Sequence, residues 1–235
     1  MNRDNPTLTE LYASLASRSP DVRERAVERL SSFSEPAAFR AILRMASDVN
    51  GSVRTRVAES LRNYDRRGTV ATLIRLCTDR EVLARLNAIE SLGILRSRTG
   101  LVSAKKMLRN DRQPLVRAYA AEAIGRIGDH NAKLALMRHF ATEKSSSVRL
   151  RIAAALYALG KRDAWMDILR FLNDPDYQVR CAAAIILEEC VNAGTRSLLI
   201  DVLKKRLKVE KTEAVRSRLR EVLHDLRRGA RRKGL

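Results

Sequence analysis

The stretch DPDYQVRCAAAIILEE at residues 174–189 contains the pattern that decides the fold. An acid lies six residues before an arginine, Arg180. Apolar residues then recur every four positions, at Val179, Ala183 and Leu187. This spacing places the apolar side chains on one face of an α-helix, and the small residues beside them allow a second helix to pack closely. The stretch therefore predicts the buried helix of a helix pair.

The same pattern occurs seven times, which indicates a repeat protein. The equivalent arginines are separated by 31, 31, 32, 32, 31 and 36 residues, and six of the seven have an acid six positions upstream. All 21 positions of the seven stripes are apolar, beginning with Val22, Ala26 and Leu30, so we predict that all are buried. The arginines are Arg23, Arg54, Arg85, Arg117, Arg149, Arg180 and Arg216.

A second helical segment precedes each stripe, and Gly or Pro residues fall between the segments. Ser19 and Ser34, each shortly before a proline, are predicted N-caps. No strand-like alternation is present, so we predict an all-α, right-handed α-solenoid of about seven two-helix repeats in a single domain over residues 1–226, with a basic flexible tail at 227–235. The predicted repeats are 7–33, 35–64, 67–97, 99–128, 130–160, 162–193 and 194–226.

The chain resembles the HEAT-like repeats first catalogued in phycobilisome lyases. The motifs that carry this resemblance are PDVRERAVERL (20–30), PLVRAYAAEAIGRIGD (114–129), SVRLRIAAALYALG (147–160) and DPDYQVRCAAAIILEE (174–189). The resemblance implies that the recurring acids and arginines form a ladder between repeats, with Asp48, Asp79, Asp111 and Asp174 each near a ladder arginine. It also implies that the second helix of each pair, helix B, lines the concave face, where function is to be sought.

The resemblance is specific for the fold but not for the function. HEAT-like hydroxylases hold two irons with His-Glu pairs, whereas His130, His139 and His224 are followed by Asn, Phe and Asp. HEAT-like DNA glycosylases are rich in Trp and Tyr, whereas Trp165 is the only Trp here. We therefore expect no enzymatic activity, no cofactor and no metal. A lyase-chaperone and a DNA glycosylase rank lower as alternatives.

The chain is strongly basic, with 46 Lys and Arg against 27 Asp and Glu, for a net charge of +19. Such an excess favours acidic partners, although the Arg-rich codons of a GC-rich genome would also produce it. The charge is uneven: residues 162–193 sum to −3 and residues 194–235 to +9. We expect a cytoplasmic monomer, because the sequence shows no secretory signal or membrane span and its cysteines, predicted to be buried thiols, show no disulfide framework. These cysteines are Cys77, Cys181 and Cys190.

One region of helix B differs from the others. Arg25, Arg56 and Arg218 each precede a glutamate by three residues, so each can pair within its helix. Arg151 precedes Ala154 instead and is predicted to be unpaired. Arg beside Tyr and apolar residues is typical of a protein-binding hot spot; the alternative is that these helices bury more surface against a longer first helix or a bound tail. The predicted partner site is Tyr119, Arg151, Ala154, Ala182 and Ile185.

A second basic series lies in the turns between repeats and in the tail. In a solenoid these turns follow one edge, about 10 Å apart, so they could track a phosphate backbone or an acidic chain; solvated turns with no partner are the alternative. The leading hypothesis is a binding scaffold for an acidic or mixed protein partner, and the second is a nucleic-acid-binding solenoid. The residues of this series are Arg66, Arg67, Arg96, Arg98, Lys161, Arg162, Arg196, Arg227 and Arg228.

Overall fold

A computed structural model describes residues 6–232, with side chains described through residue 228. The described residues contain fourteen α-helices, three short 3₁₀ turns and no strand. They fall into two compact units, Met1–Asp129 and His130–Leu235. The helix pairs and the absence of strands within the described residues confirm the predicted all-α solenoid class. The single-domain boundary at residues 1–226 stays a prediction.

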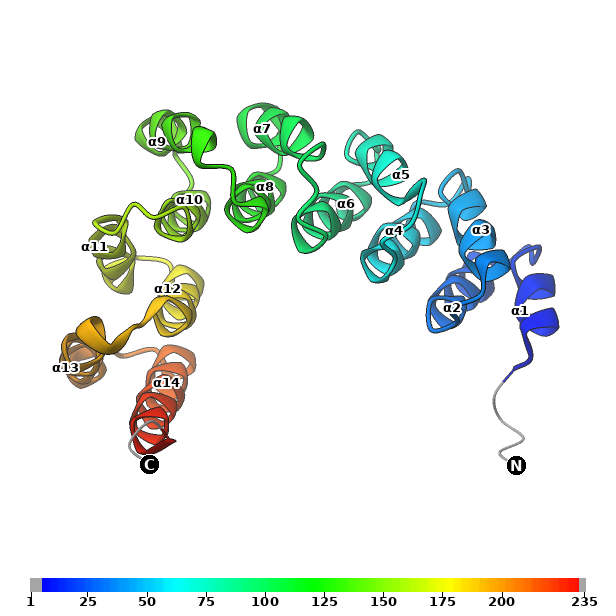
Figure 1. Ribbon diagram of the computed structural model, residues 1–235. Coiled ribbons are helices and arrows are strands. Elements are labelled where there is room, and N and C mark those ends of the chain that lie inside the picture. The colour runs from blue at the N-terminus through cyan, green and yellow to red at the C-terminus, as the bar shows by residue number, and fades with distance from the viewer. Residues whose placement is uncertain (1–5, 233–235) are drawn as a thin grey trace. The chain divides into compact units, whose positions relative to one another are not determined.

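The first unit contains four helix pairs (Figure 1). The second helices, α2, α4, α6 and α8, pack against one another in chain order, and α3, α5 and α7 pack against them from outside. At Gly93 of α6, an added Cβ would lie 2.9 Å from the Ala123 Cα of α8, so this approach requires glycine. The helices are α1 (Leu8–Ser14), α2 (Pro20–Leu30), α3 (Pro36–Met45), α4 (Gly51–Ser60), α5 (Thr69–Leu76), α6 (Val82–Ile94), α7 (Leu101–Asn110) and α8 (Pro114–Ile127), with the 3₁₀ turn η1 (Leu61–Asn63) after α4.

The second unit contains three helix pairs (Figure 1). Helix α12 packs against both α10 and α14, and α9, α11 and α13 pair with the helices that follow them. The helices are α9 (Lys133–Thr142), α10 (Ser146–Ala158), α11 (Ala164–Arg170), α12 (Tyr177–Cys190), α13 (Ala193–Val209) and α14 (Glu213–Arg232), with the 3₁₀ turns η2 (His130–Ala132) and η3 (Phe171–Asn173).

Helix starts follow the local sequence, with one correction. Asn50 and Asp176 cap α4 and α12, because their side chains accept hydrogen bonds from the amides two residues on. Ser19 occupies the N-cap of α2 without a side-chain bond. The prediction for Ser34 is wrong: Glu35 is the N-cap of α3, because Pro36 is the first helical residue and the cap directly precedes it.

The predicted apolar stripes form the core, with one exception. Twenty of the 21 positions are buried, from Ala26 and Leu30 in α2 to Val215, Leu219 and Leu223 in α14. Val22, by contrast, is 39% exposed. It lies in the first turn of α2, and the seven-residue helix α1 is too short to cover it.

The flexible tail at 227–235 stays a prediction, although helix α14 extends into this segment. Helix α14 continues to Arg232, six residues past the predicted boundary. Leu226 is buried, and its carbonyl accepts a hydrogen bond of 3.1 Å from Arg196 Nη1, so the helix is anchored where the tail was expected to begin. The residues that follow are mostly Arg and Ala, which favour helix. Residues 233–235 lie outside the described part.

Candidate protein-binding surface

The recurring arginines of the first unit connect successive helix pairs. Arg54 donates from Nε and Nη2 to both carboxylate oxygens of Asp79, 2.7 Å each, and from Nη1 to the Asp48 carbonyl at 2.8 Å. Arg23 binds Asp48 in the same way, and Arg85 binds Asp111. These side chains are nearly buried. The ladder implied by the resemblance is therefore present in this unit, and its arginines are not available to a partner.

The ladder carboxylates titrate below their ordinary range. Burial raises the pKa of Asp79, but the hydrogen bonds from Arg54 and the Glu81 amide outweigh burial and lower it. The pKa values of Asp48 and Asp111 are lowered by the same balance. These carboxylates are therefore charged partners in a structural pair rather than acids or bases for catalysis.

In the second unit, one Arg–acid pair of the ladder, which we call a rung, includes an additional arginine. Arg180 donates from Nε and Nη2 to Glu210, at 2.9 and 3.0 Å, and Arg206 donates to the same carboxylate at 2.5 Å. Burial raises the pKa of Glu210, but the bonds from Arg180, the Thr212 amide and Arg206 lower it to about 2. Glu210 therefore joins α12 to the turn between α13 and α14 as a charged group.

Another rung of the second unit has a different form. The guanidinium of Arg149 lies over the rings of Phe140 and Phe171, at 4.9 and 5.9 Å from their centroids. Its Nε is buried and has no hydrogen-bond partner among the described residues. Asp174, which has the spacing of a rung partner, accepts a hydrogen bond from the Asp176 amide, and its carbonyl accepts one from Arg180. Asp174 thus lies near a ladder arginine as predicted, but through its backbone.

The predicted pairs within helix B form in two cases. Arg56 binds Glu59 at 2.7 Å, and Arg218 binds Glu221 at 2.8 Å. Arg56 also reaches across to α2, where it contacts Glu24 and Glu28. The pair expected within α2 is therefore replaced, among the described residues, by one between α2 and α4. These pairs cover the helix-B positions of α4 and α14 with charge.

The second unit brings together four of the five predicted partner-site residues. Arg151 and Ala154 lie on α10, Ala182 and Ile185 lie on α12, and these two helices pack against each other. All four are half-buried and lie outside the core stripe. We call these four residues the helix-B surface of the second unit. Tyr119, also half-buried, lies on α8 of the first unit.

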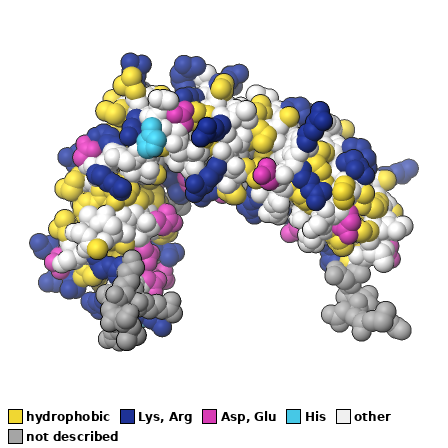
Figure 2. Space-filling view, in the orientation of Figure 1, with side chains coloured by type: hydrophobic (Ala, Val, Ile, Leu, Met, Phe, Trp, Pro, Cys, Tyr) yellow, Lys and Arg dark blue, Asp and Glu magenta, His cyan; other side chains and the backbone are white. Residues whose placement is uncertain are grey.

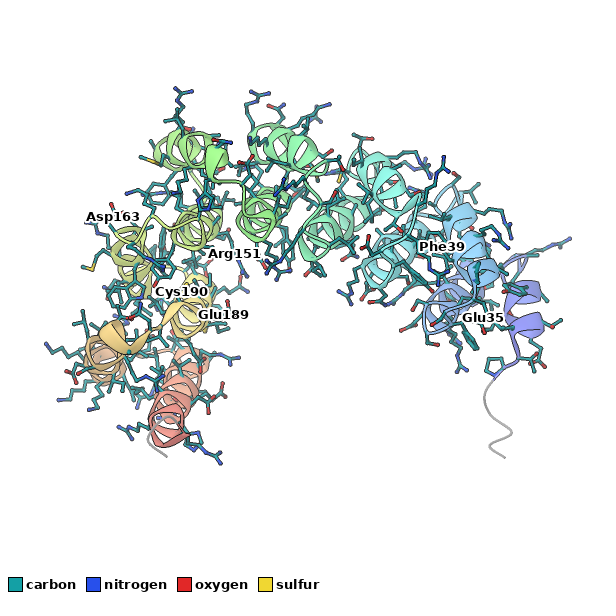
Figure 3. The ribbon with its side chains drawn as sticks, in the orientation of Figure 1. Glu35, Phe39, Arg151, Asp163, Glu189 and Cys190 are labelled. Carbon is teal, nitrogen blue, oxygen red and sulfur yellow. The ribbon has the colours of Figure 1, made fainter. Side chains whose placement is uncertain are left out.

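The charge at this surface differs from the expectation in one respect. The prediction that Arg151 would lack a partner is wrong, because Arg151 does interact with another residue. Carboxylates flank the surface toward α14: burial raises the pKa of Glu188, and the neighbouring charges of Asp225, Glu189 and Glu221 raise it further. Figure 3 shows Arg151 on α10 and Glu189 on α12. The surface thus combines apolar side chains with acidic neighbours.

Burial makes the thiols of the three cysteines weaker acids. Burial raises the pKa of Cys77 to about 12, and burial and the Glu189 charge raise that of Cys190 to about 11. Cys77 is buried as predicted, whereas Cys181 and Cys190 are only half-buried. Both lie on α12. Their raised pKa values argue against use as nucleophiles.

Four of the nine residues in the basic series make contacts within the chain that the sequence did not reveal. Arg66 lies over the rings of Phe39 and Tyr64 and donates to the Ser34 carbonyl at 2.6 Å. Arg162 lies 5.2 Å from the Tyr157 ring centroid. Lys161 pairs with Asp163, and Arg196 binds the Leu226 carbonyl. For Arg66 and Arg162, the aromatic residues close by were the feature of the sequence that could have indicated these contacts. The exposed members of the series are Arg67, Arg96, Arg98, Arg162, Arg227 and Arg228.

No helix in the described part of the chain is long and apolar enough to cross a membrane. No group of three or more His, Cys, Asp or Glu side chains in the described part could hold a metal ion.

Comparisons with known proteins agree with this architecture. A family model of HEAT repeats matches residues 5–93 and 101–166. The solved structure of the complex of CpcE and CpcF of phycocyanin lyase from Nostoc sp. PCC7120 is similar at a TM-score of 0.66 and 20% identity, over 96% of this chain and 97% of that chain. A designed armadillo repeat protein, YIII(Dq)4CqI, has a TM-score of 0.43 and 15% identity, over 94% and 100%. No curated protein sequence matches the chain.

Proposed function

The chain belongs to the HEAT repeat family, and on that premise we propose that it is a non-catalytic scaffold that binds a protein partner on the helix-B surface of the second unit. HEAT repeats form a scaffold compatible with protein binding. One observation carries the choice of surface. Where α4 and α14 carry Arg–Glu pairs, α10 and α12 present Ala154, Ala182 and Ile185, which lie off the core and reach solvent.

The charges beside this surface indicate what kind of partner fits. Arg151 on α10 suits an acidic group, whereas Glu188 and Glu189 on α12 suit basic ones. A wholly acidic partner would meet the α12 carboxylates, and like charges brought together cost binding energy. Of the two partner types expected from the sequence, the geometry therefore favours the mixed one. Cytoplasmic localisation and a monomeric state stay predictions from the sequence.

The test uses the intact protein as bait after nuclease treatment of the extract. Wild type and the control Val102→Asp, which changes a 75% exposed residue of α7, should retain the same protein partner. Ile185→Asp should lose it, since a central anchor contributes about 2 kcal/mol or more, which is roughly 30-fold in affinity. Equal retention by Ile185→Asp would contradict this choice of surface.

Comparison of extracts with and without nuclease treatment distinguishes this proposal from nucleic-acid binding. If nuclease removes all captured material, and Arg67→Glu with Arg98→Glu weakens binding while Ile185→Asp does not, the basic turns are the binding region. Phosphate contacts would also give a steep fall of log affinity with log salt. A protein interface built on apolar anchors should depend on salt less steeply.

A further inference from the structure

The last helix pair contains a groove that the sequence did not single out. Helices α13 and α14 enclose a groove of about 760 Å³ with apolar residues Leu207 and Leu223 in its wall. Figure 2 shows Lys and Arg side chains gathered over this part of the second unit. The basic side chains that line the groove are Lys204, Lys205, Lys208, Arg216, Arg220 and Arg227.

Helical spacing shows that this groove is separate from the helix-B surface. Arg216, Arg220 and Arg227 recur at intervals of four and seven residues, so they share one face of α14. Arg218 lies about half a turn away from them and Glu221 about a third of a turn, and the charges of both act on Glu188 of α12. Helix α14 therefore presents one face to the groove and another toward α12. The two surfaces can be altered independently.

Some groove charges are neutralised within the chain, and others are not. Glu213 pairs with Arg216 at 3.3 Å and Arg220 at 2.8 Å, and Asp201 lies 3.8 Å from Lys204. Among the described residues, Lys205, Lys208 and Arg227 form no ion pair, and all three are exposed. A ligand that fits this groove must therefore supply negative charge.

The apolar wall narrows the class of ligand further. Single-stranded nucleic acid is usually held by stacking successive bases on several aromatic rings, whereas the described lining residues include one ring, the imidazole of His224, and no Phe, Tyr or Trp. Phosphate contacts alone make no use of Leu207 and Leu223. An acidic amphipathic helix offers both carboxylates for the lysines and apolar side chains for the wall. Charge and apolarity together favour such a segment.

We propose that the α13–α14 groove binds an acidic amphipathic segment of a protein partner. Carboxylates of the segment pair with Lys205, Lys208 and Arg227, and its apolar side chains contact Leu207 and Leu223. This site is additional to the helix-B surface, and its test does not depend on the partner of that surface.

The experiment measures binding of a labelled peptide by fluorescence anisotropy. The peptide is helical, about four turns long, with Glu on one face and Leu on the other; the full-length chain is the receptor. Lys205→Glu with Lys208→Glu should weaken binding at least about tenfold, because two attractive charges become repulsive. The control is Arg40→Glu with Arg44→Glu, which changes the same net charge on exposed residues of α3, and it should bind within about twofold of wild type.

Two further probes decide the class of ligand. Polyglutamate of the same length should bind more weakly than the amphipathic peptide, since it has no apolar face. Equal binding of polyglutamate, or an equal loss in both double variants, would show a general charge effect and overturn the proposal. A single-stranded oligonucleotide that binds the groove more tightly than the peptide, and loses binding in Lys205→Glu with Lys208→Glu, would overturn it in favour of nucleic acid.

Discussion

The two units use the same Arg motif in different ways. In the first unit, Arg23, Arg54 and Arg85 each form two short hydrogen bonds with an aspartate 25 or 26 residues later. In the second unit, Arg180 reaches a glutamate 30 residues later that also binds Arg206, and Arg149 lies over two aromatic rings. The first unit is therefore regular, and the second departs from regularity at both rungs.

The difference teaches that sequence spacing alone does not determine the partner of a buried arginine. Asp174 follows Arg149 by 25 residues, the spacing that produces a rung in the first unit. Phe140 and Phe171 instead provide ring faces within reach, and a guanidinium can interact with either kind of group. The 30-residue spacing of the other rung arises because α13 is 17 residues long, compared with 8 to 10 for α3, α5 and α7.

The largest effect should come from breaking a regular rung. Arg54→Met removes both hydrogen bonds to Asp79 and leaves that carboxylate, only 10% exposed, without its partner. Loss of one member of a buried pair costs about 3–5 kcal/mol. Urea unfolding followed by circular dichroism measures this loss. A cost below about 1 kcal/mol would place the pair among weak surface salt bridges.

The enlarged rung should make stability depend on pH. The pKa of Glu210 is about 2 in the folded chain against an ordinary value of 4.5, so its contribution is present above pH 4.5 and is lost as pH falls toward 2. At neutral pH this contribution is on the order of 3 kcal/mol. Wild type should therefore be more stable than Glu210→Gln at pH 7, and the difference should shrink steadily below about pH 5.

The comparison of these two proteins over pH isolates one carboxylate. Asp48, Asp79 and Asp111 also have lowered pKa values, so both proteins lose stability in acid. The difference between the urea unfolding midpoints of wild type and Glu210→Gln therefore measures the contribution of Glu210 alone. A gap that stays constant from pH 7 to pH 3 would mean that Glu210 acts through packing rather than through its charge.

The fold was predictable from the sequence because it depends on a repeated local pattern. Apolar stripes at helical spacing located the second helix of every pair, and only Val22 fell outside the core. The candidate site was predictable only in part. The residues of α10 and α12 could be placed on one face, but the interaction of Arg151 and the stacking of Arg66 on Phe39 depend on neighbours that are distant in sequence.

The groove between α13 and α14 was not found from the sequence for the same reason. The excess charge of residues 194–235 was visible, but it was assigned to turns and a tail. Its concentration on facing sides of two helices depends on how long α13 and α14 are and where they end. Composition gives the amount of charge, whereas helix length and packing decide where that charge gathers.

Exposed charge pairs should contribute less than the rungs and should differ between the two units. Arg56 contacts Glu24, Glu28 and Glu59, and its side chain is 26% exposed. Among the residues that the structure describes, Arg218 is within ion-pair distance of Glu221 alone, and its side chain is 43% exposed. Arg56→Ala should cost about 1 kcal/mol and Arg218→Ala less than about 0.5 kcal/mol. Both costs should decrease in high salt, and equal costs in the two variants would show that the network adds nothing to a single pair.

The smallest effect should come from the rung that aromatic rings replace. Arg149→Met removes a guanidinium whose buried Nε has no hydrogen-bond partner among the described residues. The change loses contacts with Phe140 and Phe171 worth about 0.5–2 kcal/mol, but methionine sulfur also contacts rings favourably, by about 0.3–1.5 kcal/mol. Removal of an unsatisfied buried polar group offsets the remainder. Arg149→Met should therefore unfold within about 0.5 kcal/mol of wild type, against a cost of about 3–5 kcal/mol for Arg54→Met. If Arg149→Met costs as much as Arg54→Met, the stacked arginine stabilises its unit as strongly as a paired one, and the two units differ in geometry but not in energy.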